Sequence, residues 1–161
     1  MIHMTSPDRV EAILAEGLRT GREPELTSDA VWTLGYYGTN PVFLATETSD
    51  FIAAVRERDW SGHATLEVDA TGLELVADLA CLIDAGARHD EDGYLFWPPA
   101  RVPETMRPFI DHDGAIEIEF LLDPATDACK AAIRLTGTAA CLADIPAERL
   151  SRTIVEAGLK P

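Results

Sequence analysis

Residues 1–21, MIHMTSPDRVEAILAEGLRTG, decide how the rest of the chain is interpreted. The first four residues are typical of a short strand, and His3 lies on it. Ser6 can cap a helix whose first position is Pro7, where the missing N–H costs nothing. Apolar residues then repeat at helical spacing: Val10, Ile13 and Leu14. Gly17 supplies the left-handed residue that commonly ends a helix. The sequence therefore predicts a strand–turn–helix unit with a histidine at its start.

The length and composition predict one globular domain over residues 1–161. The chain has 161 residues, of which 47% are hydrophobic and 25% are charged, so it can bury a sizeable core. Three cysteines lie far apart, without the spacing of a zinc site: Cys81, Cys129 and Cys141. We expect buried thiols in a reducing compartment and no metal site.

Hydropathy predicts a cytoplasmic protein without a membrane span. No apolar run approaches the roughly 18 residues that cross a bilayer. His3, Asp8 and Arg9 interrupt the apolar core that an N-terminal signal peptide would need.

The formal charge of −15 argues against a general nucleic-acid binder, because phosphate affinity comes mostly from Lys and Arg. The acidity is concentrated in residues 84–127, where eleven Asp or Glu outnumber three Arg. This stretch is a possible surface for a basic protein partner. An anionic ligand would be repelled less near Arg9, Arg19 and Arg22.

The remaining pattern alternates strands and helices. Residues 20–40 predict a long loop, of the kind that usually binds a ligand or carries an active site. Strands are predicted over 41–45, 64–69, 94–97, 111–123, 138–144 and 151–159. Helices are predicted over 46–59, 75–86 and 124–136, with Phe51, Ile52 and Val55 buried in the first of these. This order predicts an α+β domain.

Several catalytic signatures do not occur in the chain. GxGxxG, GxxxxGK[ST], HExxH and GxSxG are missing. The acidic stretches at His89 and at Asp111 do not continue into a calcium loop, because Leu122 stands where the bidentate ligand counted from Asp111 would be. Both are interpreted as acidic turns.

Three stretches resemble the ADP-ribosyltransferase-like superfamily, which includes NAD-dependent ADP-ribosyltransferases and RNA 2'-phosphotransferases. IHMTS, with its His-x-Thr, is similar to the first-strand motif, and VEAILAEGL to the helix that follows. VFLAT before DFIAA is similar to the second strand and its helix, while TLEVDATGLEL and TAACLADIPAERL are similar to later strands of small bacterial members. The resemblance implies a small split sheet, mixed or antiparallel, flanked by helices.

The resemblance implies a site for NAD. His3 would hold the ribose hydroxyls of the adenosine half, the Met4 backbone would pair with the nicotinamide amide, and Thr5 would support the turn or bond a ribose. Flat aromatic side chains would stack against the nicotinamide ring: Tyr36, Tyr37, Phe43 and Phe51. We expect His3 and Phe43 on neighbouring strands, bordering one cleft that residues 20–40 cover.

The chain departs from the family at two positions. Many transferases carry an aromatic residue where this chain has Ala54, and a glutamate at the head of the strand where it has Thr138. That glutamate stabilises the cationic ribose as nicotinamide leaves. Glu119, or else Glu117, could replace it, because both are expected on one face of the strand over 111–123.

Three functions stay open at this point. The first is an NAD-using ADP-ribosyltransferase or NAD glycohydrolase, a toxin or a modification enzyme. The second is a catalytically silent relative that binds a nucleotide or a protein, which Thr138 and Ala54 favour. The third is an acidic interaction module of the immunity or antitoxin kind. The RNA 2'-phosphotransferase branch needs basic residues for an RNA phosphate, which the overall charge does not favour.

Overall fold

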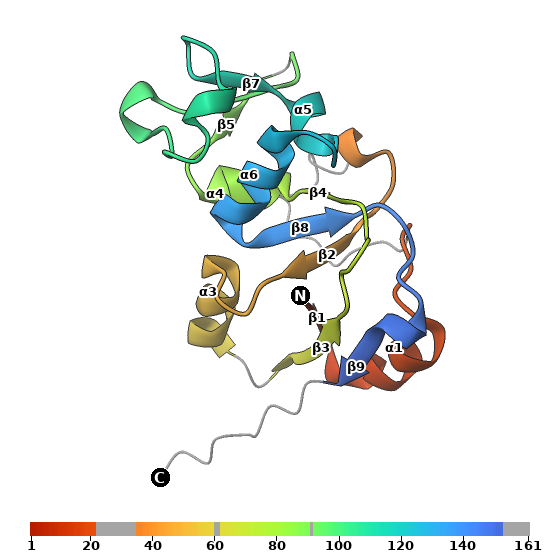
Figure 1. The fold of residues 1–161 in the computed structure, drawn as a ribbon. Helices are drawn as coiled ribbons and strands as arrows, with labels where there is room; N and C mark the ends of the chain where they lie inside the picture. Colours follow the sequence, from red (N-terminus) through yellow and green to blue (C-terminus); the bar gives the residue numbers. More distant parts are fainter. Residues whose placement is uncertain (22–34, 60–61, 91, 153–161) are drawn as a thin grey trace.

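The computed structural model describes residues 1–21, 35–59, 62–90 and 92–152. Their strands form a six-stranded sheet and a three-stranded sheet, and every strand pair is antiparallel (Figure 1). Helices lie against both sheets. The predicted α+β class is confirmed at this level. Each helix in the described ranges is too short or too polar to cross a lipid bilayer.

The six-stranded sheet has β1 and β2 at its centre. Its order across the sheet is β4 (Leu75–Ala77), β8 (Thr138–Cys141), β2 (Val42–Ala45), β1 (Ile2–Thr5), β3 (Ala64–Val68) and β9 (Leu150–Arg152). β1 pairs with β3 through all four of its residues, whereas its register with β2 consists of Ile2 opposite Ala45. The two central strands therefore separate after one pair, and the sheet is split there.

Two helices cover opposite faces of this sheet. A 3-10 turn (Pro7–Arg9) leads into α1 (Val10–Glu16), which Gly17 ends with a φ of 84°. α1 packs on the face that carries Leu44 and Leu66, while α3 (Asp50–Asp59) places Ile52 against Ile2 and Ala45 on the other face. Figure 1 shows α1 and α3 on either side of the central strands.

The acidic stretch builds the second sheet and the helices around it. The sheet consists of β5 (Arg88–His89), β6 (Tyr94–Phe96) and β7 (Ala115–Glu117). The helices near it in sequence are α4 (Leu79–Asp84), α5 (Ile118–Leu122) and α6 (Asp127–Thr136). Single 3-10 turns complete the described elements, over Pro99–Arg101, Arg107–Phe109 and Ala147–Arg149.

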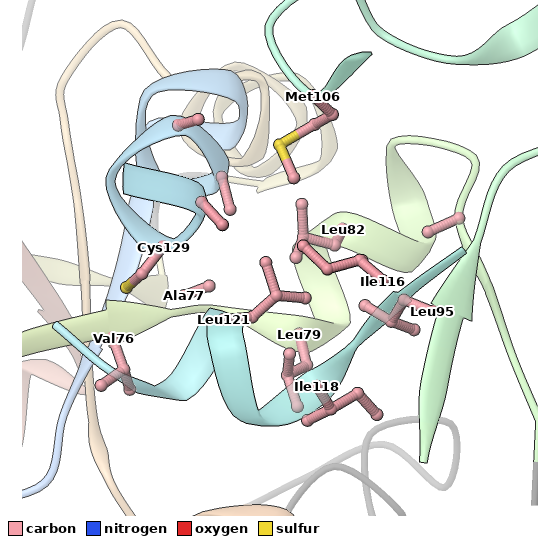
Figure 2. Close-up of a cluster of buried hydrophobic side chains, with 14 of the residues drawn as sticks. Val76, Ala77, Leu79, Leu82, Leu95, Met106, Ile116, Ile118, Leu121 and Cys129 are labelled. Carbon is pink, nitrogen blue, oxygen red and sulfur yellow. The ribbon is translucent and has the colours of Figure 1, made fainter. Parts of the chain in front are cut away.

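The largest core joins the two sheets. Val76 and Ala77 of the six-stranded sheet belong to the same buried cluster as Leu95 and Ile116 of the three-stranded sheet. Figure 2 shows these side chains together with Leu121 of α5. Burial of this surface holds the two sheets to each other, since apolar burial is the main favourable term in folding.

The strand predicted over 111–123 is confirmed only over Ala115–Glu117, and it is wrong on both sides of these residues. The chain turns from β7 into α5, so Ile118 and Leu121 point into the core at helical spacing and Phe120 is 51% exposed. Alternating Ile and Phe is compatible with a strand, but burying Ile118 and Leu121 together requires a helix. Figure 2 shows both side chains in the core cluster.

Two further predictions are corrected by the structure. The helix predicted over 75–86 is β4 followed by α4, because the carboxylate of Asp78 caps α4 by accepting a hydrogen bond from the Cys81 N–H at 3.2 Å. Residues 35–37, predicted as loop, are helical. The rest of that loop, 22–34, and the predicted strand beyond 152 lie outside the described residues.

Candidate functional site

His3 lies at the split between β1 and β2. Its Nδ1 is 3.0 Å from the backbone carbonyl oxygen of Phe43. A carbonyl only accepts, so Nδ1 carries the proton and donates, which leaves Nε2 of the neutral ring as an acceptor. Among the described residues, none hydrogen-bonds to Nε2. The expectation that His3 and Phe43 lie on neighbouring strands is confirmed.

The surroundings of His3 keep the imidazole neutral. Burial lowers the pKa of His3, the hydrogen bond to Phe43 raises it, and the nearby positive charge of Arg9 lowers it again. The net direction is downward from the usual value. At neutral pH the ring therefore offers Nε2 as a hydrogen-bond acceptor in a fixed orientation.

His3 and Phe43 do not project their side chains from one face of the sheet. His3 is directly opposite Leu66 on β3, which belongs to the core beneath α1. Phe43 is opposite Ala140 on β8, and both belong to the core that joins the sheets. The expectation of one cleft bordered by both side chains is therefore wrong. The hydrogen bond between the His3 imidazole and β2 is made to the backbone carbonyl of Phe43.

Tyr37 is a structural residue. Its hydroxyl donates to the Ala77 carbonyl at 3.0 Å and accepts from the Leu79 N–H at 2.9 Å, and burial raises its pKa. Its ring meets that of Phe43 edge-on, with the centroids 6.1 Å apart. These contacts occupy the tyrosine that we expected to stack on nicotinamide.

The other predicted NAD residues have different exposures. Tyr36 is 37% exposed. Phe51, expected in the core, is 44% exposed, whereas its neighbour Ile52 in the first turn of α3 is fully buried. On β1, Met4 is half-buried and Thr5 is buried. Only His3, Met4 and Thr5 lie together on β1.

Glu117 and Glu119 do not share a face. Glu117 ends β7, where its Oε1 accepts from the Tyr94 hydroxyl at 3.4 Å, while Glu119 lies in the first turn of α5. Both belong to the part of the chain around the three-stranded sheet, which Figure 1 shows above the six-stranded sheet that contains β1. The structure does not bring either glutamate to His3.

Sequence reasoning missed a buried carboxyl group, that of Asp78. Asp78 directly follows β4 and is 6% exposed, and burial raises its pKa. Thr138, where the resemblance requires a glutamate, begins the neighbouring strand β8 and is 2% exposed. A single aspartate inside the apolar stretch LVADLACL was the available signal.

The larger of two described hollows has a volume of about 670 Å³ and lies at the ends of β1, β3 and β9. Four carboxylates are among its lining residues: Glu47, Glu67, Asp69 and Glu148. Its arginine, Arg149, donates to the backbone carbonyls of Asp69 at 3.2 Å and Thr71 at 2.6 Å. This hollow repels a diphosphate, and none of the predicted NAD residues lines it.

Two other acidic or apolar features lie around the three-stranded sheet. An apolar hollow of about 290 Å³ lies between Phe109, Ile116 and Phe120.

Asp111, His112 and Asp113 lie close enough to hold one cation. However, Asp111 Oδ1 already accepts hydrogen bonds from the backbone N–H groups of Asp113 and Ala115, each at 2.9 Å. That bonding is typical of the acidic turn that the sequence predicts.

Comparisons with protein-family models, with curated proteins and with solved structures found no match to this chain.

Proposed function

We propose that this chain is an ADP-ribosyltransferase-like domain that binds NAD at the split between β1 and β2 and cleaves the bond between nicotinamide and ribose. The observation that carries the proposal is the imidazole of His3, fixed at the split with Nδ1 donating to the Phe43 carbonyl. This orientation leaves Nε2 to accept a hydrogen bond from a ribose hydroxyl. The split six-stranded sheet agrees with the fold that the resemblance implies.

The backbone beyond His3 supports the same proposal. Met4 has a register partner on β3 but none on β2, because the central strands have separated by that point. An unpaired strand edge offers backbone N–H and C=O groups, and an amide such as that of nicotinamide can pair with both. Met4 would hold nicotinamide in this way while His3 holds a ribose.

Charge also favours this end of β1 for an anionic ligand. Arg9 is close enough to His3 to lower its pKa, so its positive potential reaches the split. The diphosphate of NAD would gain from this potential, whereas the acidic hollow at the other end of β1 would repel it.

The reaction requires a negative group close to the ribose. When the glycosidic C–N bond breaks, its electron pair leaves with nicotinamide, and positive charge develops on the ribose carbon. Water or another acceptor then attacks that carbon and releases a proton. A preorganised carboxylate stabilises such charge best in a site that excludes water.

A second function is favoured by the position of the predicted carboxylates. Glu117 and Glu119 lie around the other sheet, and Thr138 begins β8. A relative without a carboxylate at the site would bind NAD and leave it intact. Binding and cleavage therefore have to be measured separately.

The test is a calorimetric titration with NAD, together with chromatographic detection of released nicotinamide. We expect the wild-type protein to bind, with stabilisation of about 2.7 kcal/mol at 100 times the dissociation constant. His3→Ala should lose binding and keep its circular dichroism spectrum. His112→Ala is the matched control, because His112 is exposed in the acidic turn, and it should bind as the wild type does.

Each outcome decides between the alternatives. Binding with release of nicotinamide supports the enzyme, and binding without release supports the silent relative. If the wild-type protein does not bind NAD, or if His3→Ala binds it equally well, the proposal is wrong.

A further inference from the structure

Phe120 is an apolar side chain that the fold of α5 directs outward. Each residue of an α-helix turns by about 100°, so burying Ile118 and Leu121 in the core places Phe120 on the opposite side of α5. Phe120 is 51% exposed. The Thr126 hydroxyl donates to the Phe120 carbonyl at 2.5 Å, which ties this part of α5 to the start of α6. The fold therefore presents a phenyl ring to solvent on a fixed backbone.

Phe120 forms one wall of the apolar hollow of about 290 Å³. The other walls come from the 3-10 turn over Arg107–Phe109, from β7 and from the start of α6, and their apolar residues are Phe109, Ile116 and Ala128. An apolar cavity of roughly 150 Å³ accommodates benzene. The hollow therefore has room for one large apolar side chain, which is the form that the central anchor of a protein interface usually takes.

The chain around this hollow is strongly acidic. Residues 104–127 contain seven Asp or Glu and one Arg. The nearby cations are already paired, because Arg107 Nε lies 2.8 Å from Glu104 and Lys130 Nζ lies 3.6 Å from Asp127. Within the described ranges, no Lys or Arg forms an ion pair with the other five carboxylates, and each of the five lies within three residues of one that lines the hollow: Asp111, Asp113, Glu117, Glu119 and Asp123. The hollow therefore lies in a negative potential.

This charge selects among the possible occupants of the hollow. A second copy of the chain would bring the same carboxylates to the interface, and the net charge of −15 opposes that approach. A partner that carries Lys or Arg beside an apolar side chain gains apolar burial in the hollow and attraction to the carboxylates around it. Charge complementarity therefore favours a basic partner over a second copy.

We propose that this hollow docks an amphipathic segment of a basic protein. One large apolar side chain of that segment fills the hollow and packs against Phe120, while its flanking Lys or Arg side chains face the surrounding carboxylates. The charges steer the partner to this surface, and the apolar anchor holds it there. Neither His3 nor Met4 lines the hollow, so docking does not depend on the proposed NAD site.

The probe is a synthetic helical peptide of leucine and lysine, with the leucines on one face, titrated into the full-length chain. Two matched peptides replace every lysine with glutamate or every leucine with serine. We expect only the leucine–lysine peptide to bind tightly, and its binding should weaken as salt is added. In NMR spectra the methyl signals of Ile116, which lines the hollow, should shift, whereas those of Leu66 in the core beneath α1 should not.

Phe120→Asp separates docking in the hollow from general attraction between opposite charges. This variant gains a negative charge but loses the apolar wall, so we expect its affinity for the leucine–lysine peptide to fall by about 10-fold or more. Phe51→Asp is the matched control, because it makes the same change at a position on α3 that is 44% exposed, and it should not weaken binding. Phe120→Leu stays apolar and should keep the affinity. All three variants should keep the wild-type circular dichroism spectrum.

Several outcomes would overturn this docking site. If Phe120→Asp binds the leucine–lysine peptide as tightly as the wild-type protein does, or if the serine–lysine peptide binds equally well, charge alone attracts the peptide. A wild-type dimer in sedimentation equilibrium that Phe120→Asp converts to a monomer would show that a second copy covers the hollow instead. Failure of the leucine–lysine peptide to bind would also show that the proposal is wrong. The affinity for NAD is measured separately and is unaffected by any of these results.

Discussion

At the scale of one residue, the lowered pKa of His3 makes the stability of the protein depend on pH. Burial lowers its pKa in the folded protein, while the unfolded chain keeps a value of about 6.5. Just below that value the unfolded state binds more protons than the folded state, so stability rises with pH. The contribution of His3 to the free energy of unfolding is therefore complete above about pH 6.5. It is lost as the pH falls from the pKa of His3 in the unfolded chain toward its lower pKa in the folded protein.

Replacing His3 with Asn tests this dependence. Asn keeps a side-chain N–H that can donate to the Phe43 carbonyl but does not titrate. We expect the urea midpoint of the wild-type protein to fall more steeply than that of His3→Asn between pH 7 and pH 5. Parallel curves for the two proteins would show that His3 is not held neutral by folding. Other titrating groups contribute equally to both proteins and cancel in the difference.

At the scale of one element, the position of α1 depends on the glycine that ends it, Gly17. Gly17 has a φ of 84°, and a Cβ there would lie 2.4 Å from the backbone oxygen of Ile145. The Leu18 N–H donates to the same oxygen at 2.8 Å, so the chain cannot move away without losing this bond. Glycine is required here for its conformation and also for the close approach of two backbones.

Gly17→Ala should therefore destabilise the protein more than Gly72→Ala. Gly72 also has a positive φ, of 73°, but nothing lies within 4 Å of a Cβ added there. We expect a loss of about 1 kcal/mol for Gly72→Ala, the usual cost of a left-handed alanine. Gly17→Ala should cost at least about 2 kcal/mol more, because its Cβ meets backbone that cannot rotate away. Urea unfolding of both variants measures the difference, and equal losses would contradict the packing argument.

At the scale of the whole molecule, the shared core predicts one cooperative unit. Leu95 of the three-stranded sheet is fully buried in the cluster that also contains Val76 and Ala140 of the six-stranded sheet. Because neither sheet buries this surface alone, we expect them to unfold together.

Leu95→Ala tests the cooperativity of the two sheets. We expect a loss of about 2–5 kcal/mol in the free energy of unfolding, from lost burial and the cavity left behind. NMR signals of Leu66 in β3 and Ile116 in β7 should still disappear at the same urea concentration. Loss of the Ile116 signal at lower urea than that of Leu66 would show two independent units. Phe120→Ala, at a half-exposed position on α5, should cost less.

The sequence by itself determined the elements whose signals are local. Apolar residues at helical spacing and a closing glycine predicted α1 and α6, and short apolar runs predicted β1, β2, β3 and β8. The predicted cap at Ser6 is wrong, because its side chain makes no capping hydrogen bond and a 3-10 turn precedes α1. The strand position of His3 also followed from local pattern, whereas its neighbouring strand was expected from the resemblance. Where two periods fitted the same residues, as in IEIEFLL, local pattern could not choose between a strand and a helix.

Only the tertiary structure decided which side chains meet. Residues 118–122 form the helix α5 because Ile118 and Leu121 are both buried in the core. Glu117 and Glu119 therefore do not lie on one face of a strand, as the sequence had predicted. Asp78 and Thr138 are 60 residues apart in sequence, and only the pairing of β4 with β8 brings them together. Strand pairing depends on contacts far apart along the chain, whereas caps and periodicity are complete within one turn or one strand. For that reason the strand position of His3 could be predicted from the sequence, and the buried pair of Asp78 and Thr138 could not.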